Sequence, residues 1–153
     1  MVSLDLSQNG LTRECAQALY QMLRLTESIV HLEIGSTLGS FQNRLGREVW
    51  LQFSKIFYQK PQPLLQILNI SGVSLSSQDL QTFANAIVQS NYCFLEQLDI
   101  SNNRIQGVSG GQAIATLLNH YVKPGIPLQT LTVKQNKLEN EGAALVFEAL
   151  LHP

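Results

Sequence analysis

Short runs of alternating apolar and polar residues recur along the chain, and each is followed by a longer stretch with helical spacing. Leu98 and Ile100 are separated by one polar residue, as are Leu131 and Val133, which is the period of a strand with one buried face. The longer stretches carry apolar residues every three to four positions, as amphipathic helices do. We expect helices at residues 14–25, 47–58, 77–89, 111–121 and 141–151, with Thr12, Ser76 and Asn140 as candidate N-caps.

One pattern, L-x-x-L-x-L-x-x-N-x-L, organises these units. It is complete at residues 95–105 and 128–138. A copy at residue 65 has Val73 in place of the asparagine, a copy at residue 29 reaches Asn43 late because residues 37–42 are inserted, and a further copy starts at Met1. The repeats thus start near residues 1, 29, 65, 95 and 128, a spacing of about 28 to 33 residues without the insertion. We expect one domain, residues 1–153.

These copies resemble the leucine-rich repeat family, and their length resembles its ribonuclease-inhibitor-like class. The resemblance implies an α/β solenoid, a right-handed horseshoe segment with parallel strands on the concave face and helices on the convex face. It also implies that the repeat asparagines turn inward and bond the backbone where each strand ends, and that the turn at Gly72 and Val73, which lacks one, is less tightly held. These asparagines are Asn9, Asn43, Asn103 and Asn136.

Alternate strand residues are expected to line the concave wall and to contact a protein partner. The candidates there are Asp5, His31, Glu33, Asn69, Gln97, Asp99 and Thr132. The carboxylates of Asp5, Glu33 and Asp99 form an acidic stripe that favours a basic partner, and stacking is expected to raise their pKa values. The alternative is a solvent-exposed wall that binds no partner, because the sequence Leu-Asp-Leu-Ser is common in such repeats.

The insertion offers a second candidate surface. Leu38 and Phe41 are apolar where a loop is normally polar, so they are candidates for partner contact. Phe41 could equally fold down to cover a gap at the edge of its repeat. The sequence leaves these two possibilities open.

Charge and composition narrow the class of partner. The chain is 44% hydrophobic and 14% charged, with a formal net charge of −1. This balance disfavours nucleic acid and anionic membrane surfaces as partners, and we expect neither. The chain has no long apolar run and no signal-like start, and Cys15 and Cys93 suggest reduced thiols, so we expect a cytoplasmic protein.

Motifs for catalysis are missing. The chain has no P-loop and no Gly-x-Ser-x-Gly sequence, and His31, His120 and His152 stand in different repeats without metal-ligand spacing. We therefore expect no cofactor, no metal and no enzymatic activity, and a role as a protein-interaction scaffold.

Members of the resembled class include CARMIL-type regulators of actin capping, nucleotide-sensing immune receptors and Ran GTPase-activating proteins.

Two alternatives remain open. The resemblance to Ran GTPase-activating proteins places Arg44 and Arg104, each directly after a repeat asparagine, where a loop arginine could assist phosphoryl transfer. Separately, the chain opens on a strand and closes on an apolar helix at residues 143–151, with no polar capping repeat. That predicts either a fragment of a longer repeat protein or self-association through open repeat ends.

Overall fold

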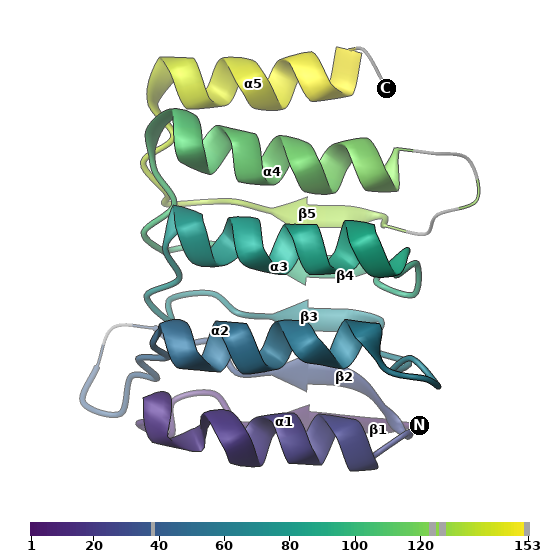
Figure 1. The fold of residues 1–153 in the computed structure, drawn as a ribbon. Helices are drawn as coiled ribbons and strands as arrows, with labels where there is room; N and C mark the ends of the chain where they lie inside the picture. The colour runs from purple at the N-terminus through teal and green to yellow at the C-terminus, as the bar shows by residue number, and fades with distance from the viewer. Residues whose placement is uncertain (38, 123–124, 126–127, 152–153) are drawn as a thin grey trace.

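Five strands and five helices alternate along the chain. The computed structural model describes residues 1–37, 39–122, 125 and 128–151. The strands are β1 (Val2–Asp5), β2 (Ile29–Glu33), β3 (Ile67–Asn69), β4 (Gln97–Asp99) and β5 (Thr130–Thr132). The helices are α1 (Ala16–Leu25), α2 (Arg47–Ser54), α3 (Ser77–Ser90), α4 (Gly107–Tyr121) and α5 (Glu139–Leu151) (Figure 1). Short 3-10 turns, η1 (Arg13–Cys15) and η2 (Lys55–Tyr58), adjoin α1 and α2.

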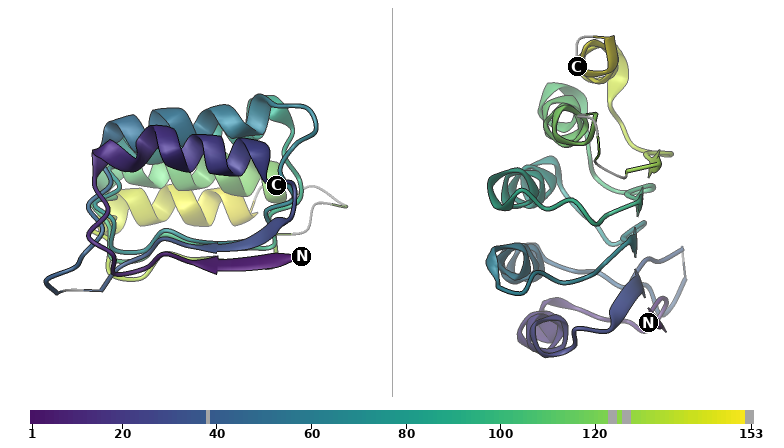
Figure 2. Two further views of the ribbon diagram at one scale, coloured as in Figure 1. Left: turned by 90° about the horizontal axis from the view of Figure 1, so that it is seen from below. Right: turned by 90° about the vertical axis from the view of Figure 1, so that its right-hand side faces the viewer.

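The strands form one parallel sheet in the order β1-β2-β3-β4-β5. Each strand returns to its neighbour through a helix, as parallel pairing requires. All five helices lie on one side of this sheet (Figure 2). We call the other side, which no helix of the described part covers, the open face. The arrangement confirms the predicted α/β class and is compatible with a leucine-rich-repeat-like fold.

The core lies between the sheet and the helices. Strand leucines such as Leu32, Leu68 and Leu98 are almost fully buried beneath the helices. Aromatic rings fill the space under α2 and α3, where Phe57 lies 4.7 Å from Tyr92 and 5.4 Å from Phe83 between ring centroids. These edge-to-face contacts add to the stabilisation from apolar burial.

Three helix starts differ in detail from the prediction. Ser76 caps α3 as expected, accepting from the Asp79 N–H at 3.2 Å, whereas the Thr12 side chain accepts no cap hydrogen bond from η1. α4 begins at Gly107 rather than at residue 111. Gly107 and Gly110 belong to this helix although glycine has a low helix propensity. α5 begins at Glu139, so Asn140 lies inside that helix and the predicted cap is wrong.

Asparagines bind successive units together. The Asn43 side chain is fully buried; its Oδ1 accepts from the N–H groups of Asn9 and Leu11, and its Nδ2 donates to the carbonyls of Leu6 and Ile34. Asn103 and Asn136 repeat this pattern, each reaching the turn of the unit before it. The prediction of an inward-turned asparagine is confirmed at these three positions.

Asn9 fits the prediction only in part. Its side chain donates to the Ser7 carbonyl where its strand ends, at 2.9 Å, but it is exposed and does not turn inward. The other three asparagines bond to a preceding unit, and Asn9 stands in the first unit that the structure describes.

The turn at Val73 is also held more firmly than the sequence suggests. Asn103 from the next unit accepts from the N–H groups of Val73 and Leu75, at 3.1 and 2.9 Å. An asparagine at position 73 would accept a hydrogen bond from the Asn43 N–H. Ser36 Oγ accepts that bond instead, at 2.7 Å. The expected looseness is therefore wrong, because neighbouring units supply the bonds that the missing asparagine would have made.

Candidate functional site

The strand register gathers the predicted wall residues on the open face. Ser3 pairs with His31, His31 with Ile67, and Ile67 with Gln97, which itself pairs with Thr130. A second row runs two residues further along each strand. Its members are Asp5, Glu33, Asn69, Asp99 and Thr132. All seven wall residues named from the sequence thus lie in two adjacent rows, as the alternation predicts.

Hydrogen bonds fix the side chains around Glu33. Its Oε1 lies 3.1 Å from His31 Nε2, and its Oε2 accepts from Asn69 Nδ2 at 3.3 Å. On its other ring nitrogen, Nδ1, His31 lies 3.0 Å from Ser3 Oγ. The Glu33 side chain remains one-third exposed. This carboxylate is held in place yet still reaches solvent, so it can accept further hydrogen bonds from a cationic partner.

The Ser3–His31–Glu33 contacts contain the residue types of a hydrolase triad. Catalysis by such a triad also needs a substrate pocket and an oxyanion site beside the serine. The hollow on the open face is centred further along the sheet, and neither Ser3 nor His31 lines it. Its lining consists of Glu33, Ile67, Leu68, Asn69, Gln97, Leu98, Asp99, Thr130 and Thr132. The contacts therefore serve to position Glu33.

Three residues of the second row also stabilise the ends of their own strands. Asp5 Oδ1 accepts from the Ser7 N–H, and Asp99 Oδ1 from the Ser101 N–H, both at 2.8 Å. Asn69 Oδ1 accepts from the Ser71 N–H at 2.9 Å. Asp99 and Asn69 are half-buried, so part of each side chain is still available to a partner.

The expected rise in carboxylate pKa is wrong for Asp5. Hydrogen bonds from Ser7, through its side chain and then its backbone N–H, lower the pKa of Asp5 below its ordinary value. His31 lowers it further through its charge. Stacking is also interrupted, because Asn69 stands between Glu33 and Asp99 in the row.

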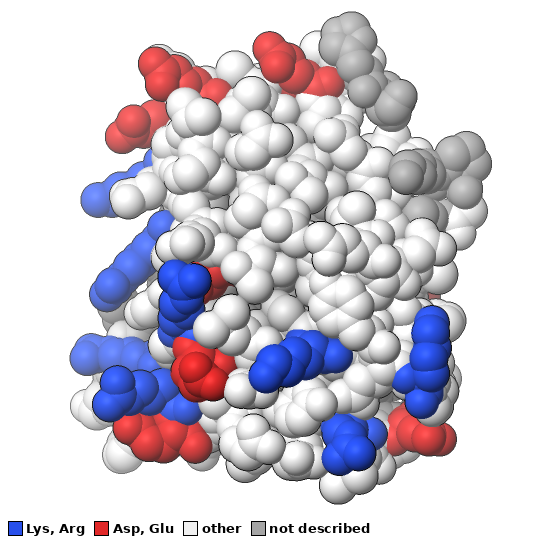
Figure 3. All heavy atoms as spheres, in the orientation of Figure 1, with Lys and Arg blue, Asp and Glu red and all other residues white. Residues whose placement is uncertain are grey.

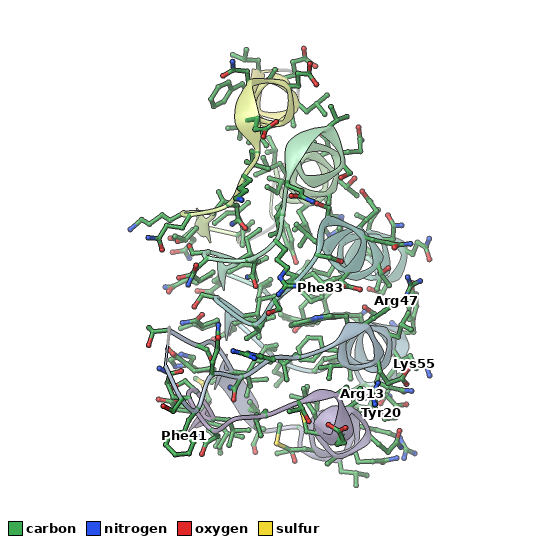
Figure 4. The ribbon with its side chains drawn as sticks, turned by 90° about the vertical axis from the view of Figure 1, so that its left-hand side faces the viewer. Arg13, Tyr20, Phe41, Arg47, Lys55 and Phe83 are labelled. Carbon is green, nitrogen blue, oxygen red and sulfur yellow. The ribbon has the colours of Figure 1, made fainter. Side chains whose placement is uncertain are left out.

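The insertion presents Phe41 to solvent. The side chain is 70% exposed and projects from the loop (Figure 4), which decides against the possibility that it folds down. Its backbone carbonyl accepts from the Gly10 N–H at 2.7 Å and so ties the loop to the first unit. Leu38, the other candidate in this loop, lies outside the described residues.

A second hollow lies where the strands end and the helices begin. Arg44 and Arg104 both line it, together with Gln42, Gly72, Ser74, Asn102 and Asn103. Basic side chains gather along this edge of the molecule, at the left of Figure 3. The sequence pointed to the two arginines separately but did not indicate that they share one hollow. The sequence feature that could have indicated this is the position directly after the repeat asparagine. Three successive units have Arg44, Ser74 and Arg104 there, so only one short side chain separates the arginines.

Comparison with protein families matches residues 94–113 to the family described as Leucine Rich Repeat. Residues 94–113 form a leucine-rich repeat. This repeat covers β4 and the start of α4, and it includes Asp99 and Asn103. Repeats of this kind commonly take part in protein–protein interaction and are typically non-enzymatic. No curated protein sequence matches the chain.

Two further properties of the described residues bear on function. None of their helices is both long and apolar enough to cross a membrane. Within the same residues, no group of three or more His, Cys, Asp or Glu side chains could hold a metal ion. His152 lies outside this part of the chain.

Proposed function

We propose that the chain is a non-catalytic protein-interaction module that binds a protein partner on its open face. In this proposal its five units form a leucine-rich repeat solenoid of the ribonuclease-inhibitor-like class, with the open face as the concave wall. The repeat at residues 94–113 and the complete helix in every unit support this assignment. The loop that carries Phe41 adds an apolar contact beside the wall.

The observation that carries the proposal is the arrangement around Glu33. His31 and Asn69 hold its carboxylate, and the hollow that begins at Glu33 continues to Asp99 across β3 and β4. Pre-positioned polar groups on a rigid sheet reduce the entropy lost when a partner binds. The hollow has a volume of about 180 Å³, which is below the size of most small-molecule pockets, so it suits side chains of a protein partner better than a separate small substrate.

The partner that fits best is a protein with a basic segment. Asp5, Glu33 and Asp99 lie in one row of the open face. Their charge would attract lysine and arginine side chains and would repel nucleic acid and anionic membranes. Cys15 and Cys93 are free thiols, and both are half-buried. They support a reducing compartment, which we propose is the cytoplasm.

A pull-down from cell extract tests the proposal with a matched pair of variants. The test variant carries Asp5→Asn, Glu33→Gln and Asp99→Asn, which removes three charges but leaves acceptors for the Ser7 and Ser101 N–H groups. The control carries Glu27→Gln, Glu48→Gln and Glu148→Gln, three exposed carboxylates away from the open face. A partner retained by the control and lost by the test variant is the expected result. Equal retention by both would contradict a role for the acidic row.

A GTPase-activating role is the alternative, because Arg44 and Arg104 are exposed and line one hollow. Replacing each arginine with alanine and measuring GTP hydrolysis by small GTPases separates the two functions. Hydrolysis stimulated by the wild type and lost in either variant would favour catalysis. Self-association is a further alternative, favoured by the exposed Phe147 and Leu151 on α5, and sedimentation at several concentrations tests it.

A further inference from the structure

We propose that the hollow between Arg44 and Arg104 binds carboxylate side chains from an acidic segment of a protein partner. This site lies at the strand-end edge and is separate from the open face. It neither depends on the basic partner proposed above nor excludes it.

The two arginines are anchored but their side chains are unpaired. Arg44 N–H donates to the Leu11 carbonyl and Arg104 N–H to the Leu75 carbonyl, both at 2.8 Å, so each backbone is fixed to the preceding unit. Within the described part of the chain, neither guanidinium makes a hydrogen bond or ion pair, and both residues are exposed. A guanidinium that no internal carboxylate neutralises is available for an external one.

The unit between the two arginines shapes the hollow. Ser74 occupies the position that corresponds to Arg44 and Arg104 in the neighbouring units, and the short side chain leaves space between them. Gln42 forms one side, and its Nε2 donates to the Gly72 carbonyl at 3.0 Å. Asn102 forms another side, and its amide can add a neutral donor beside the two cations.

The wider electrostatics of this edge also favour an anion. All five helices begin here (Figure 1), and each N-terminus contributes a partial positive charge. α4 has no acidic residue in its first turn, whereas Glu48, Asp79, Glu139 and Glu141 occupy the first turns of α2, α3 and α5. α1 also lacks one in its first turn, but Glu14 lies in η1, directly before it. Asp79 is buried in its cap with Ser76. The positive potential is therefore least offset near Arg104 and the start of α4.

The donors left in the hollow favour carboxylates over phosphate. Phosphate sites in loops usually rely on free backbone N–H groups. Here the N–H groups of Gly72 and Asn102 are already bonded, to Ser101 and Lys134 carbonyls at 2.9 and 2.7 Å. Among the described lining residues, Ser74 contributes the one N–H without a hydrogen bond, and a single N–H is fewer than such a loop supplies. Arginine side chains remain, and their planar fork matches a carboxylate with two parallel hydrogen bonds. Successive carboxylates of one peptide could reach both arginines and then Lys137, the cation of the next unit.

A fluorescence anisotropy titration with dye-labelled hexaglutamate tests this site. The test variant carries Arg44→Gln and Arg104→Gln. The control carries Arg24→Gln and Lys55→Gln, which removes the same charge from exposed helix positions that bond only to neutral glutamines. We expect affinity to fall about ten-fold or more in the test variant and less than about two-fold in the control. Thermal unfolding of both variants should match the wild type closely, because the side chains of Arg44 and Arg104 make no internal bond and the two bonds lost in the control are exposed.

Three results would overturn the proposal. Wild-type protein that does not bind hexaglutamate would exclude the site. Equal loss in the control would mean that only net charge matters. Displacement of the peptide by inorganic phosphate, but not by chloride or acetate at the same ionic strength, would reassign the hollow to phosphate groups. None of these results affects the pull-down with the open-face variant, so this site and the proposed function fail independently.

Discussion

At the scale of a single residue, Asn103 shows how a side chain connects successive units. It accepts from two N–H groups of the preceding turn and donates to the carbonyls of Ile70 and Ile100, at 2.8 and 3.0 Å. Asn103→Ala would remove the partner of the Val73 and Leu75 N–H groups and of the Ile70 carbonyl, at a cost of about 3 kcal/mol in the free energy of unfolding, whereas the Ile100 carbonyl would keep its bond from Asn136. Asn9→Ala is the control and should cost less than about 0.5 kcal/mol. Urea denaturation measures both free energies of unfolding. Similar costs for the two variants would contradict the role of the inward-turned asparagines in joining the units.

Asp5 gives a prediction about pH. Because its folded pKa is lowered, its contribution to stability is present above the unfolded value of 3.8 and is lost as pH falls through the folded pKa. Ser7→Ala removes the largest cause and should raise the pKa of Asp5 towards 3.8. A carboxyl NMR titration of the wild type and the variant tests this. Identical midpoints would show that the Ser7 side chain does not stabilise the carboxylate.

At the level of residues, prediction succeeded where the two-residue alternation of a strand alone decides on which face a side chain lies. Alternation placed Asp5, Glu33 and Asp99 in one row, because side chains of a strand alternate between its faces. It could not indicate the Asp5 pKa, which depends on a turn that brings Ser7 back to the carboxylate. It also missed the stability of the Val73 turn, since the bonds come from Ser36 and Asn103, in other units.

At the scale of elements, α4 and α5 approach closely through glycine. A Cβ on Gly111 would lie 2.3 Å from the Gly142 carbonyl oxygen, and one on Gly142 would lie 2.3 Å from the Gly107 carbonyl oxygen. Gly111→Ala should therefore lower the free energy of unfolding by about 2 kcal/mol, although alanine is the better helix former. Gly39→Ala is the control, because nothing lies within 4 Å of its Cβ position. Stabilisation by Gly111→Ala would show that the helices are further apart.

The same glycines explain where the element prediction failed. The periods of apolar residues gave the order of strands and helices and most helix ends. The start of α4 was expected late, at Gly111, because Gly107 and Gly110 have low helix propensity. Gly110 and Gly111 let the next unit approach, and Gly107 has a φ of +55°; neither requirement appears in local propensity.

At the scale of the whole molecule, stacking joins residues that lie far apart in sequence. Arg44 and Arg104 share a hollow only because the units that carry them flank a unit with Ser74 at the same position. The repeat pattern predicted the stacked arrangement and the open face. The sequence did not indicate the positive charge of the strand-end edge, which depends on helix N-termini (Figure 1) and basic side chains (Figure 3) that lie on the same side of the molecule.

The most direct test of the central claim maps where a basic ligand binds. Titration of the ¹⁵N-labelled chain with hexalysine, followed by amide chemical shifts, should perturb residues of β2, β3 and β4, with the largest changes around Glu33, Asn69 and Asp99. The Asp5→Asn, Glu33→Gln, Asp99→Asn variant should lose these changes. Shifts confined to α1–α5, or retained in full by that variant, would contradict a partner-binding open face.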